Sequence, residues 1–160
     1  MVKDKISAAV PLKEKKMANK KAEMFNALME GGPEGVFVIQ EGKDEVNSLI
    51  YQSKLVVNGK EKFFMIVFDD TDSTVVSFLI DDENITAQNY GYVLEFCNER
   101  NSMNRLMRYY VDRENHLLMD CCVAAREQFF DAELLANVID TMAEELADAE
   151  EALGKALRCE

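Results

Sequence analysis

Apolar and polar residues alternate along residues 46–80, and this alternation predicts three antiparallel β-strands. The dipeptide Asn58-Gly59 separates the first two apolar-rich runs. It favours a two-residue type I′ turn, because both of its residues must adopt φ > 0. A two-residue loop fixes the pairing of the flanking strands and sets Leu49 opposite Phe68. The polar residues 69–73 predict a second tight turn before the third strand.

The second turn sets Phe68 opposite Thr74, so the register divides the three strands into two faces. The first face is almost wholly apolar and is the better core; it carries Leu49, Tyr51, Leu55, Val57, Phe64, Ile66, Phe68, Val76, Phe78 and Ile80. The second face mixes polar and apolar residues and carries Ile50, Gln52, Lys54, Val56, Glu61, Phe63, Met65, Val67, Val75, Ser77 and Leu79.

Five apolar residues cluster on the second face: Phe63, Met65, Val67, Val75 and Leu79. Two interpretations stay open, since a helix could cover this cluster or a partner could bind it. Contiguous exposed apolar surface usually marks a binding site. The predicted first and last helices offer two apolar stripes, enough to cover one face of the sheet. We therefore predict that the cluster is a partner or dimer face, and that a homodimer hides part of it or the apolar side of the middle helix.

Three helices are predicted from apolar residues at 3.6-residue spacing: residues 17–29, about 87–101 with Thr86 as N-cap, and 132–157 with Asp131 as N-cap. Their expected buried residues are Met17, Met24, Phe25 and Leu28, then Tyr90, Val93, Leu94 and Cys97, and finally Leu135, Val138, Ile139, Met142, Leu146, Ala149 and Leu153. Gly91, inside the middle helix, would permit a close approach of another backbone.

A second hairpin is predicted from residues 105–111 and 116–123, with Asn115 in the left-handed conformation and Arg108 opposite Asp120. The resulting element order is α-β-β-β-α-β-β-α. This order indicates an α+β fold with an antiparallel sheet of about five strands, and residues 36–39 could be a further short strand or an extended lead-in. Residues 1–16 are predicted to be a basic N-terminal tail, and residues 17–160 a single α+β domain.

Charge is distributed unevenly along the 160 residues, whose formal net charge is −12. Residues 1–22 hold seven lysines against two acidic residues, a net of +5, whereas residues 23–160 hold 11 basic against 28 acidic residues, a net of −17. The acidic body argues against nucleic acid or a membrane as partner. No apolar stretch reaches the roughly 20 residues of a membrane span, and the N-terminus is not that of a signal peptide.

Residue types that carry chemistry are sparse. The four cysteines, Cys97, Cys121, Cys122 and Cys159, lack a Cys-x-x-Cys spacing, which indicates reduced thiols in the cytoplasm. His116 is the single histidine and lies at a hairpin end beside Asp112, without a nearby nucleophile. The acidic turns at 69–72 and 81–84 could attract a hard cation but do not match an EF-hand. We predict no catalytic residues, no cofactor and no metal site.

Residues 92–101 read Tyr-Val-Leu-Glu-Phe-Cys-Asn-Glu-Arg-Asn. This stretch resembles the helix of the YbjN family, described as bacterial sensory-transduction regulators, which ends in Leu-Asn-x-x-Asn; here Phe96-Cys97 replaces the usual apolar pair. Residues 108–112 and 117–123 and the Ala/Glu-rich helix after Asp131 follow the same plan. That family is similar in fold to the type III secretion chaperones, which are small, acidic, dimeric α+β proteins. The resemblance implies a binding module and carries over no catalytic residue.

Together, these features predict a non-enzymatic protein-binding module of regulatory or chaperone-like type, which is cytoplasmic and homodimeric and binds a further protein partner that the sequence does not identify. The alternative is a small-molecule or divalent-cation sensor, or an enzyme, that uses an acidic turn cluster.

Overall fold

The computed structural model describes residues 19–29 and 36–160. The predicted basic tail, residues 1–16, and Met17 lie outside these ranges. The elements in chain order are α1 (Lys20–Met29), β1 (Val38–Glu41), β2 (Leu49–Val57), β3 (Lys60–Phe68), β4 (Ser73–Asp81), α2 (Tyr90–Met103), β5 (Met107–Val111), β6 (Leu117–Ala124), the 3₁₀ turn η1 (Glu127–Phe129) and α3 (Ala132–Leu157). None of the described helices is long and apolar enough to cross a membrane.

The α+β fold is confirmed, with one six-stranded antiparallel sheet in the order β1-β2-β3-β4-β6-β5. The prediction of about five strands is wrong by one. The additional strand is β1, whose Val38 pairs with Gln52; a strand of four residues is too short to show a clear alternation. The registers within β2, β3 and β4 and within the β5–β6 hairpin agree with the prediction, including Leu49 opposite Phe68 and Phe68 opposite Thr74.

Local turn chemistry explains why these registers were predictable. Asn58 has φ 48° and Gly59 has φ 78°, as a type I′ turn requires. Asn115 has φ 64°, which confirms the left-handed residue of the second hairpin. The first turn also contacts α3, because the Asn58 amide donates to the Ala147 carbonyl at 3.2 Å and to the Glu150 carboxylate at 2.7 Å.

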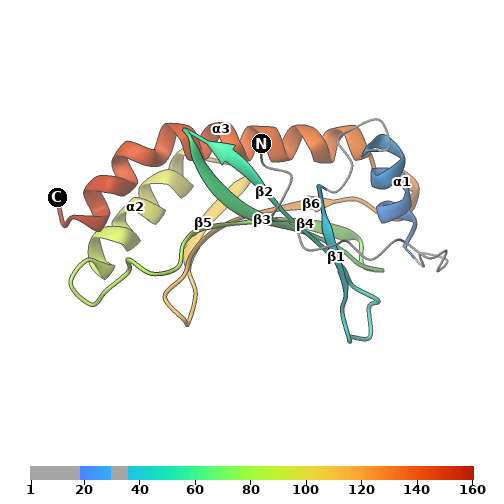
Figure 1. Cartoon of the computed structure of the whole chain (residues 1–160), viewed down its shortest axis with the longest axis horizontal. Helices are drawn as coiled ribbons and strands as arrows, with labels where there is room; N and C mark the ends of the chain where they lie inside the picture. The colour runs from blue at the N-terminus through green and yellow to red at the C-terminus, as the bar shows by residue number, and fades with distance from the viewer. Residues whose placement is uncertain (1–18, 30–35) are drawn as a thin grey trace, which may run out of the picture.

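The helices α1, α2 and α3 all lie on one side of the sheet, and they cover its first face (Figure 1). α3 runs along the length of the molecule, with α1 near one end and α2 near the other (Figure 1). The core lies between these layers, where Tyr51, Ile66, Phe68, Val76 and Phe78 are each 0% exposed. At roughly 25 cal/mol per Å² of apolar area buried, this layer supplies most of the hydrophobic stabilisation.

Two of the predicted helix stripes need correction. In α1, Phe25 is buried as expected, but Met24 and Leu28 are exposed, and Ala22 takes their place in the core. In α2, Val93 and Cys97 are buried as expected.

The other two residues predicted for the α2 stripe, Tyr90 and Leu94, are exposed, and Phe96 is buried instead. This helix begins at Tyr90 with Asn89 as its N-cap, so the predicted cap at Thr86 is wrong. A methyl group at Gly91 would meet no atom within 4 Å, so the predicted close backbone approach is also wrong.

The long helix α3 matches its prediction. Its bounds are those expected, and the Asp131 carboxylate caps it by accepting from the Leu134 amide at 3.0 Å. Leu135, Ile139, Met142, Leu146 and Ala149 are buried, whereas Val138 and Leu153 are half-buried.

A polar contact joins α2, α3 and β5 above the first face. Glu145 Oε1 accepts from Arg100 Nε at 2.8 Å and from the Tyr109 hydroxyl at 3.1 Å. The Arg100 and Glu145 side chains are only 15% and 14% exposed. Burial, together with the neighbouring Glu145 carboxylate, raises the pKa of Tyr109 above its ordinary value. This cluster stabilises the packing of the two helices on the strand.

One lysine of the basic N-terminal stretch is buried. The Lys21 ammonium donates to the carbonyl oxygens of Thr71 and Ser73 at 2.9 and 2.6 Å, and it lies 3.8 Å from an Asp69 carboxylate oxygen. The residue is 2% exposed. Because a buried ammonium needs such partners, Lys21 fixes α1 against the β3–β4 turn.

Candidate functional site

The second face of the sheet has no described helix against it. Phe63 is 51% exposed, and the other residues of the predicted cluster, Met65, Val67, Val75 and Leu79, are half-buried. Strand pairing brings all five together, since Phe63 pairs with Leu79 and Val67 with Val75. Of the two interpretations left open by the sequence, coverage by a helix does not hold for the described residues.

Pairing with β1, β5 and β6 extends the second face into three cross-strand rows. The phenylalanine row contains Lys54, Phe63, Leu79, Leu118 and Tyr110. The middle row contains Val38, Gln52, Met65, Ser77, Asp120 and Arg108. The valine row contains Gln40, Ile50, Val67, Val75 and Cys122. Neighbouring rows are about 7 Å apart, which is twice the rise per residue of a strand.

The β5 and β6 members of these rows were not predicted to join the cluster. Leu118, Asp120 and Cys122 reach it because β6 pairs with β4 rather than lying apart with its own hairpin. The apolar residues Leu118 and Cys122 at outward positions of β6 were the available signal, but strand order is a long-range property that they do not define.

The middle row is charged where it crosses β6 and β5, at Asp120 and Arg108. Asp120 Oδ2 accepts from the Tyr110 hydroxyl at 2.8 Å, while Asp120 Oδ1 is buried and has no hydrogen-bond partner within residues 19–29 and 36–160. Burial and the hydrogen bond to Asp120 raise the pKa of Tyr110 to about 12. Arg108 lies directly opposite Asp120 in the register, as the hairpin predicted.

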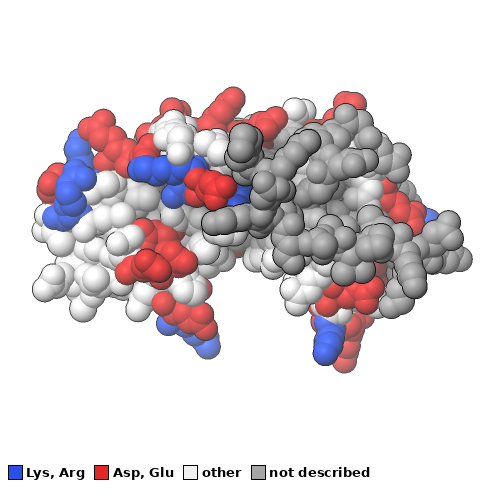
Figure 2. Space-filling view, viewed as in Figure 1, with Lys and Arg blue, Asp and Glu red and all other residues white. Residues whose placement is uncertain are grey.

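The charges on the second face balance. Lys54 and Arg108 oppose Glu61 and Asp120 among the positions of this face. Lys54 Nζ pairs with Glu61 at 3.1 Å and lies 4.3 Å from the centre of the Phe63 ring. Acidic side chains gather instead along the edge of the molecule where α3 runs (Figure 2). That helix carries seven acidic residues against Lys155.

The two edges of the sheet offer little for pairing with another strand. On the β5 edge, the Asn101 side chain accepts from the Tyr109 amide at 2.7 Å and donates to the Tyr109 carbonyl at 2.9 Å. It therefore occupies the groups that an added strand would use. The β1 edge is four residues long, and short edge strands limit such pairing. The accessible surface is thus the second face rather than an edge.

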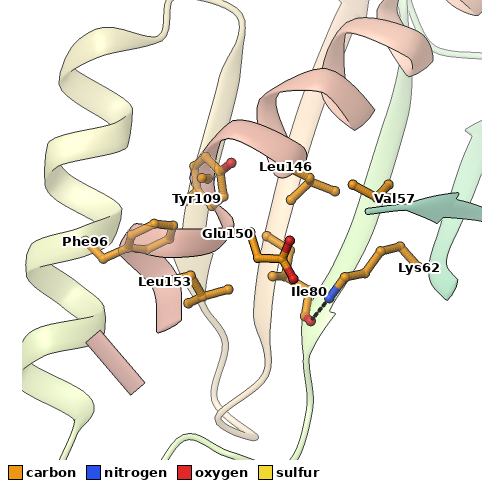
Figure 3. A pocket seen from close by; sticks show the side chains of 9 residues that line it. Val57, Lys62, Ile80, Phe96, Tyr109, Leu146, Glu150 and Leu153 are labelled. Carbon is orange, nitrogen blue, oxygen red and sulfur yellow. Dashed lines mark hydrogen bonds between the residues drawn. The ribbon is translucent and has the colours of Figure 1, made fainter. Parts of the chain in front are cut away.

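A small cavity lies between the helices and the first face, lined by Val57, Lys62, Ile80, Phe96, Tyr109, Leu146, Ala149, Glu150 and Leu153 (Figure 3). Its enclosed space is about 30 Å³, roughly the volume of one water molecule. The Lys62 ammonium donates to the Ile80 carbonyl at 3.0 Å at its edge (Figure 3). The cavity is too small for an organic ligand.

In each acidic turn named as a cation candidate, one carboxylate accepts hydrogen bonds from its own turn. Asp69 Oδ1 accepts from the Thr71 amide at 2.8 Å, and Asp81 Oδ1 accepts from the Asn84 amide at 2.7 Å. Within the described ranges, the metal-ligating groups that converge are those of Asp112, Glu114 and His116, whose ligand atoms lie within 4.8 Å of one another.

Within that convergent group, His116 Nδ1 lies 3.1 Å from Asp112 Oδ2. The backbone amides of His116 and Glu114 donate hydrogen bonds to the Asp112 carboxylate, and these bonds lower the pKa of Asp112. Such bonds are the ordinary geometry of a hairpin turn.

Comparisons of this chain with protein-family models, curated proteins and solved structures found no match. The resemblance to the YbjN family and to the type III secretion chaperones therefore stays a prediction, made from residues 92–101 and the second hairpin. Function must therefore be inferred from the geometry of the second face.

Proposed function

We propose that the protein is a non-enzymatic, protein-binding module of regulatory or chaperone-like type, and that the second face is its binding surface. One observation carries this proposal: Phe63 and its neighbours form a continuous apolar area with no described element over it, whereas α1, α2 and α3 cover the first face. Soluble proteins rarely expose such an area unless it binds something. Free thiols at Cys122 and Cys159, both exposed, fit a cytoplasmic location.

Glu145 and Lys21 are charged side chains with little exposure, and both have structural partners, which favours binding over catalysis. The Glu145 carboxylate accepts hydrogen bonds from Arg100 and Tyr109, and the Lys21 ammonium donates to two backbone carbonyls. Within the described part of the chain, neither Glu145 nor Lys21 lines a cleft that could hold a substrate, which an active site requires.

Photo-crosslinking tests the binding surface directly. Phe63 and Leu134 are each 51% exposed, the first on the second face and the second on α3, so they form a matched pair. We expect p-benzoylphenylalanine in place of Phe63 to crosslink to a protein chain in the cytosol of the source cell, and the same probe in place of Leu134 to give no product. Equal labelling from both positions, or none from position 63, would contradict the proposed surface.

A divalent-cation sensor is the second candidate, favoured by the convergence of Asp112, Glu114 and His116. Two carboxylates and an imidazole suit a transition metal better than Ca²⁺. Titration calorimetry with Zn²⁺, Ni²⁺ and Mn²⁺ tests it, with His116→Ala as the variant that should abolish any heat. No heat up to millimolar concentrations would remove this candidate.

A further inference from the structure

The three rows make the second face complementary to itself. The phenylalanine row carries large side chains, with Phe63, Leu79 and Leu118 in sequence across the sheet. The valine row carries smaller ones at the corresponding positions of the same strands, namely Val67, Val75 and Cys122. A two-fold axis along the middle row would set the phenylalanine row of each copy over the valine row of the other. Large side chains would then pack over small ones, which is how stacked sheets fill the space between them.

We propose that a second copy of this chain occupies the second face, so that two sheets pack face to face about a two-fold axis along the middle row. This inference rests on the proposed function, because it names the chain that the binding surface receives. An isologous contact of this kind is closed, since each face is fully used by the other.

The area of the second face is sufficient for a stable dimer. Strands β2, β3 and β4 have nine residues each, which corresponds to about 30 Å of length, and six strands span about 24 Å of width. The resulting footprint of roughly 700 Å² per copy is close to the roughly 800 Å² per partner of a standard stable interface.

Charge also favours a second copy over an acidic or basic partner. The second face has two positive residues, Lys54 and Arg108, and two negative residues, Glu61 and Asp120. It therefore favours neither an acidic nor a basic partner. Two copies would place their acidic α3 helices on the outer sides of the dimer, far from each other (Figure 1). The net charge of −12 on each chain then opposes association only at long range, and salt should tighten the dimer.

The polar end of the middle row supplies a specific contact. Arg108 forms no ion pair within the described residues, and Asp120 Oδ1 has no hydrogen-bond partner there. An axis along this row sets Arg108 over Arg108 of the partner subunit and Asp120 over Asp120 of the partner subunit, so the four side chains meet at the axis, and each Arg108 lies one strand away from Asp120 of the partner subunit. The two reciprocal pairs would satisfy groups that have no such partner among residues 19–29 and 36–160 of the same chain.

Sedimentation of the full chain tests the assembly. At micromolar protein and about 0.15 M salt, we expect a species of twice the 18.2 kDa chain mass. The variant Phe63→Asp should raise the dimer Kd at least 100-fold, because it buries a charge with no partner. Leu134→Asp, which changes an equally exposed residue on α3, should leave the Kd within about twofold. A wild-type chain that sediments only as a monomer overturns the inference.

Charge reversal tests the axis. In a dimer of the Arg108→Asp variant, the two copies would bring four acidic side chains together at the axis. In a dimer of the Asp120→Arg variant, they would bring four basic side chains together. Repulsion between these like charges should leave each variant monomeric. An equimolar mixture of the two should dimerise, with a Kd within about tenfold of the wild type, because each acidic pair then meets a basic pair. Circular dichroism checks that both variants are folded.

The outcomes separate the inference from the proposed function. A mixture that stays monomeric while both variants are folded, or single variants that dimerise as the wild type does, would overturn the axis. If the purified chain is monomeric but position 63 crosslinks to a different protein, the inference fails and the proposed function stands. If position 63 crosslinks to nothing, the proposed function fails as well.

Discussion

The two faces of the sheet come from the same strands and differ at every second residue. Phe63 and Phe64 are neighbours on β3, yet Phe64 is 6% exposed beneath the helices and Phe63 is 51% exposed on the second face. On β5, Tyr109 is 2% exposed and Tyr110 is 39% exposed. Because successive side chains of a strand point to opposite faces, one residue lies in the core and the next lies on the second face.

The difference shows how one sheet can carry both stability and recognition. Helices α1, α2 and α3 cover the first face, where the aromatic side chains pack at centroid distances such as 5.0 Å for Tyr51 and Phe68. The second face keeps apolar residues that no described helix covers. Substitutions on the two faces should therefore separate folding from association.

The neighbouring phenylalanines give the largest expected contrast. Phe64→Ala should lower the free energy of unfolding by about 3–5 kcal/mol, because it leaves a cavity in the core. Phe63→Ala should cost the single chain less than about 1 kcal/mol. Urea denaturation at two protein concentrations checks both, since the effect of Phe63→Ala should grow with concentration if a dimer forms, whereas that of Phe64→Ala should not. Equal losses would mean that the second face is covered in the folded chain.

The buried ion pair that holds α2 and α3 over the first face is the next target. Glu145→Ala should lower the free energy of unfolding by about 2–4 kcal/mol, since it leaves the half-buried Arg100 guanidinium and the Tyr109 hydroxyl without their acceptor. Glu151→Ala, on the exposed side of the same helix and paired with Lys155 at 2.7 Å, is the control and should cause no measurable loss. Chemical denaturation monitored by circular dichroism measures both variants. A loss equal to that of the control would mean that the cluster is not required for helix packing.

Much of this architecture follows from local chemistry. The turn residues Asn58, Gly59 and Asn115 define both hairpins, so the register and the division into two faces were predictable. The helix α3 was predictable because one stripe is apolar and the opposite side is acidic. In these segments the local pattern and the final packing agree.

The remaining features depend on contacts between distant segments. Apolar residues surround α2 on several sides, so the spacing alone could not select Phe96 over Tyr90 and Leu94. The pairing of β6 with β4 brings Asp120 and Cys122 to the second face, and no local pattern encodes strand order. Lys21 is buried only because two carbonyls of the β3–β4 turn receive its ammonium, a contact across about 50 residues of chain.

The Asn101 contact at the sheet edge gives a smaller prediction. Asn101→Ala should lower the free energy of unfolding by about 1–2 kcal/mol, because the Tyr109 amide and carbonyl both lose a partner. It should also expose the β5 edge and promote aggregation. Asn98→Ala, at an exposed position of the same helix, controls for the higher helix propensity of alanine. Light scattering during thermal unfolding measures aggregation, and an Asn101→Ala variant that behaves as Asn98→Ala does would contradict the role of the edge contact.

Gly91 gives the smallest expected effect, and its sign is opposite to that of the others. The residue lies in the first turn of α2, its φ is not positive, and a methyl group there would contact nothing within 4 Å. Gly91→Ala should therefore raise the free energy of unfolding by about 0.5–1 kcal/mol, because alanine restricts the unfolded chain without straining the helix. Gly59→Ala is the control of opposite sign, since φ is 78° at that turn residue and a side chain there is strained. Denaturant midpoints measure both variants, and a destabilising Gly91→Ala would mean that another surface packs closely on α2 in solution.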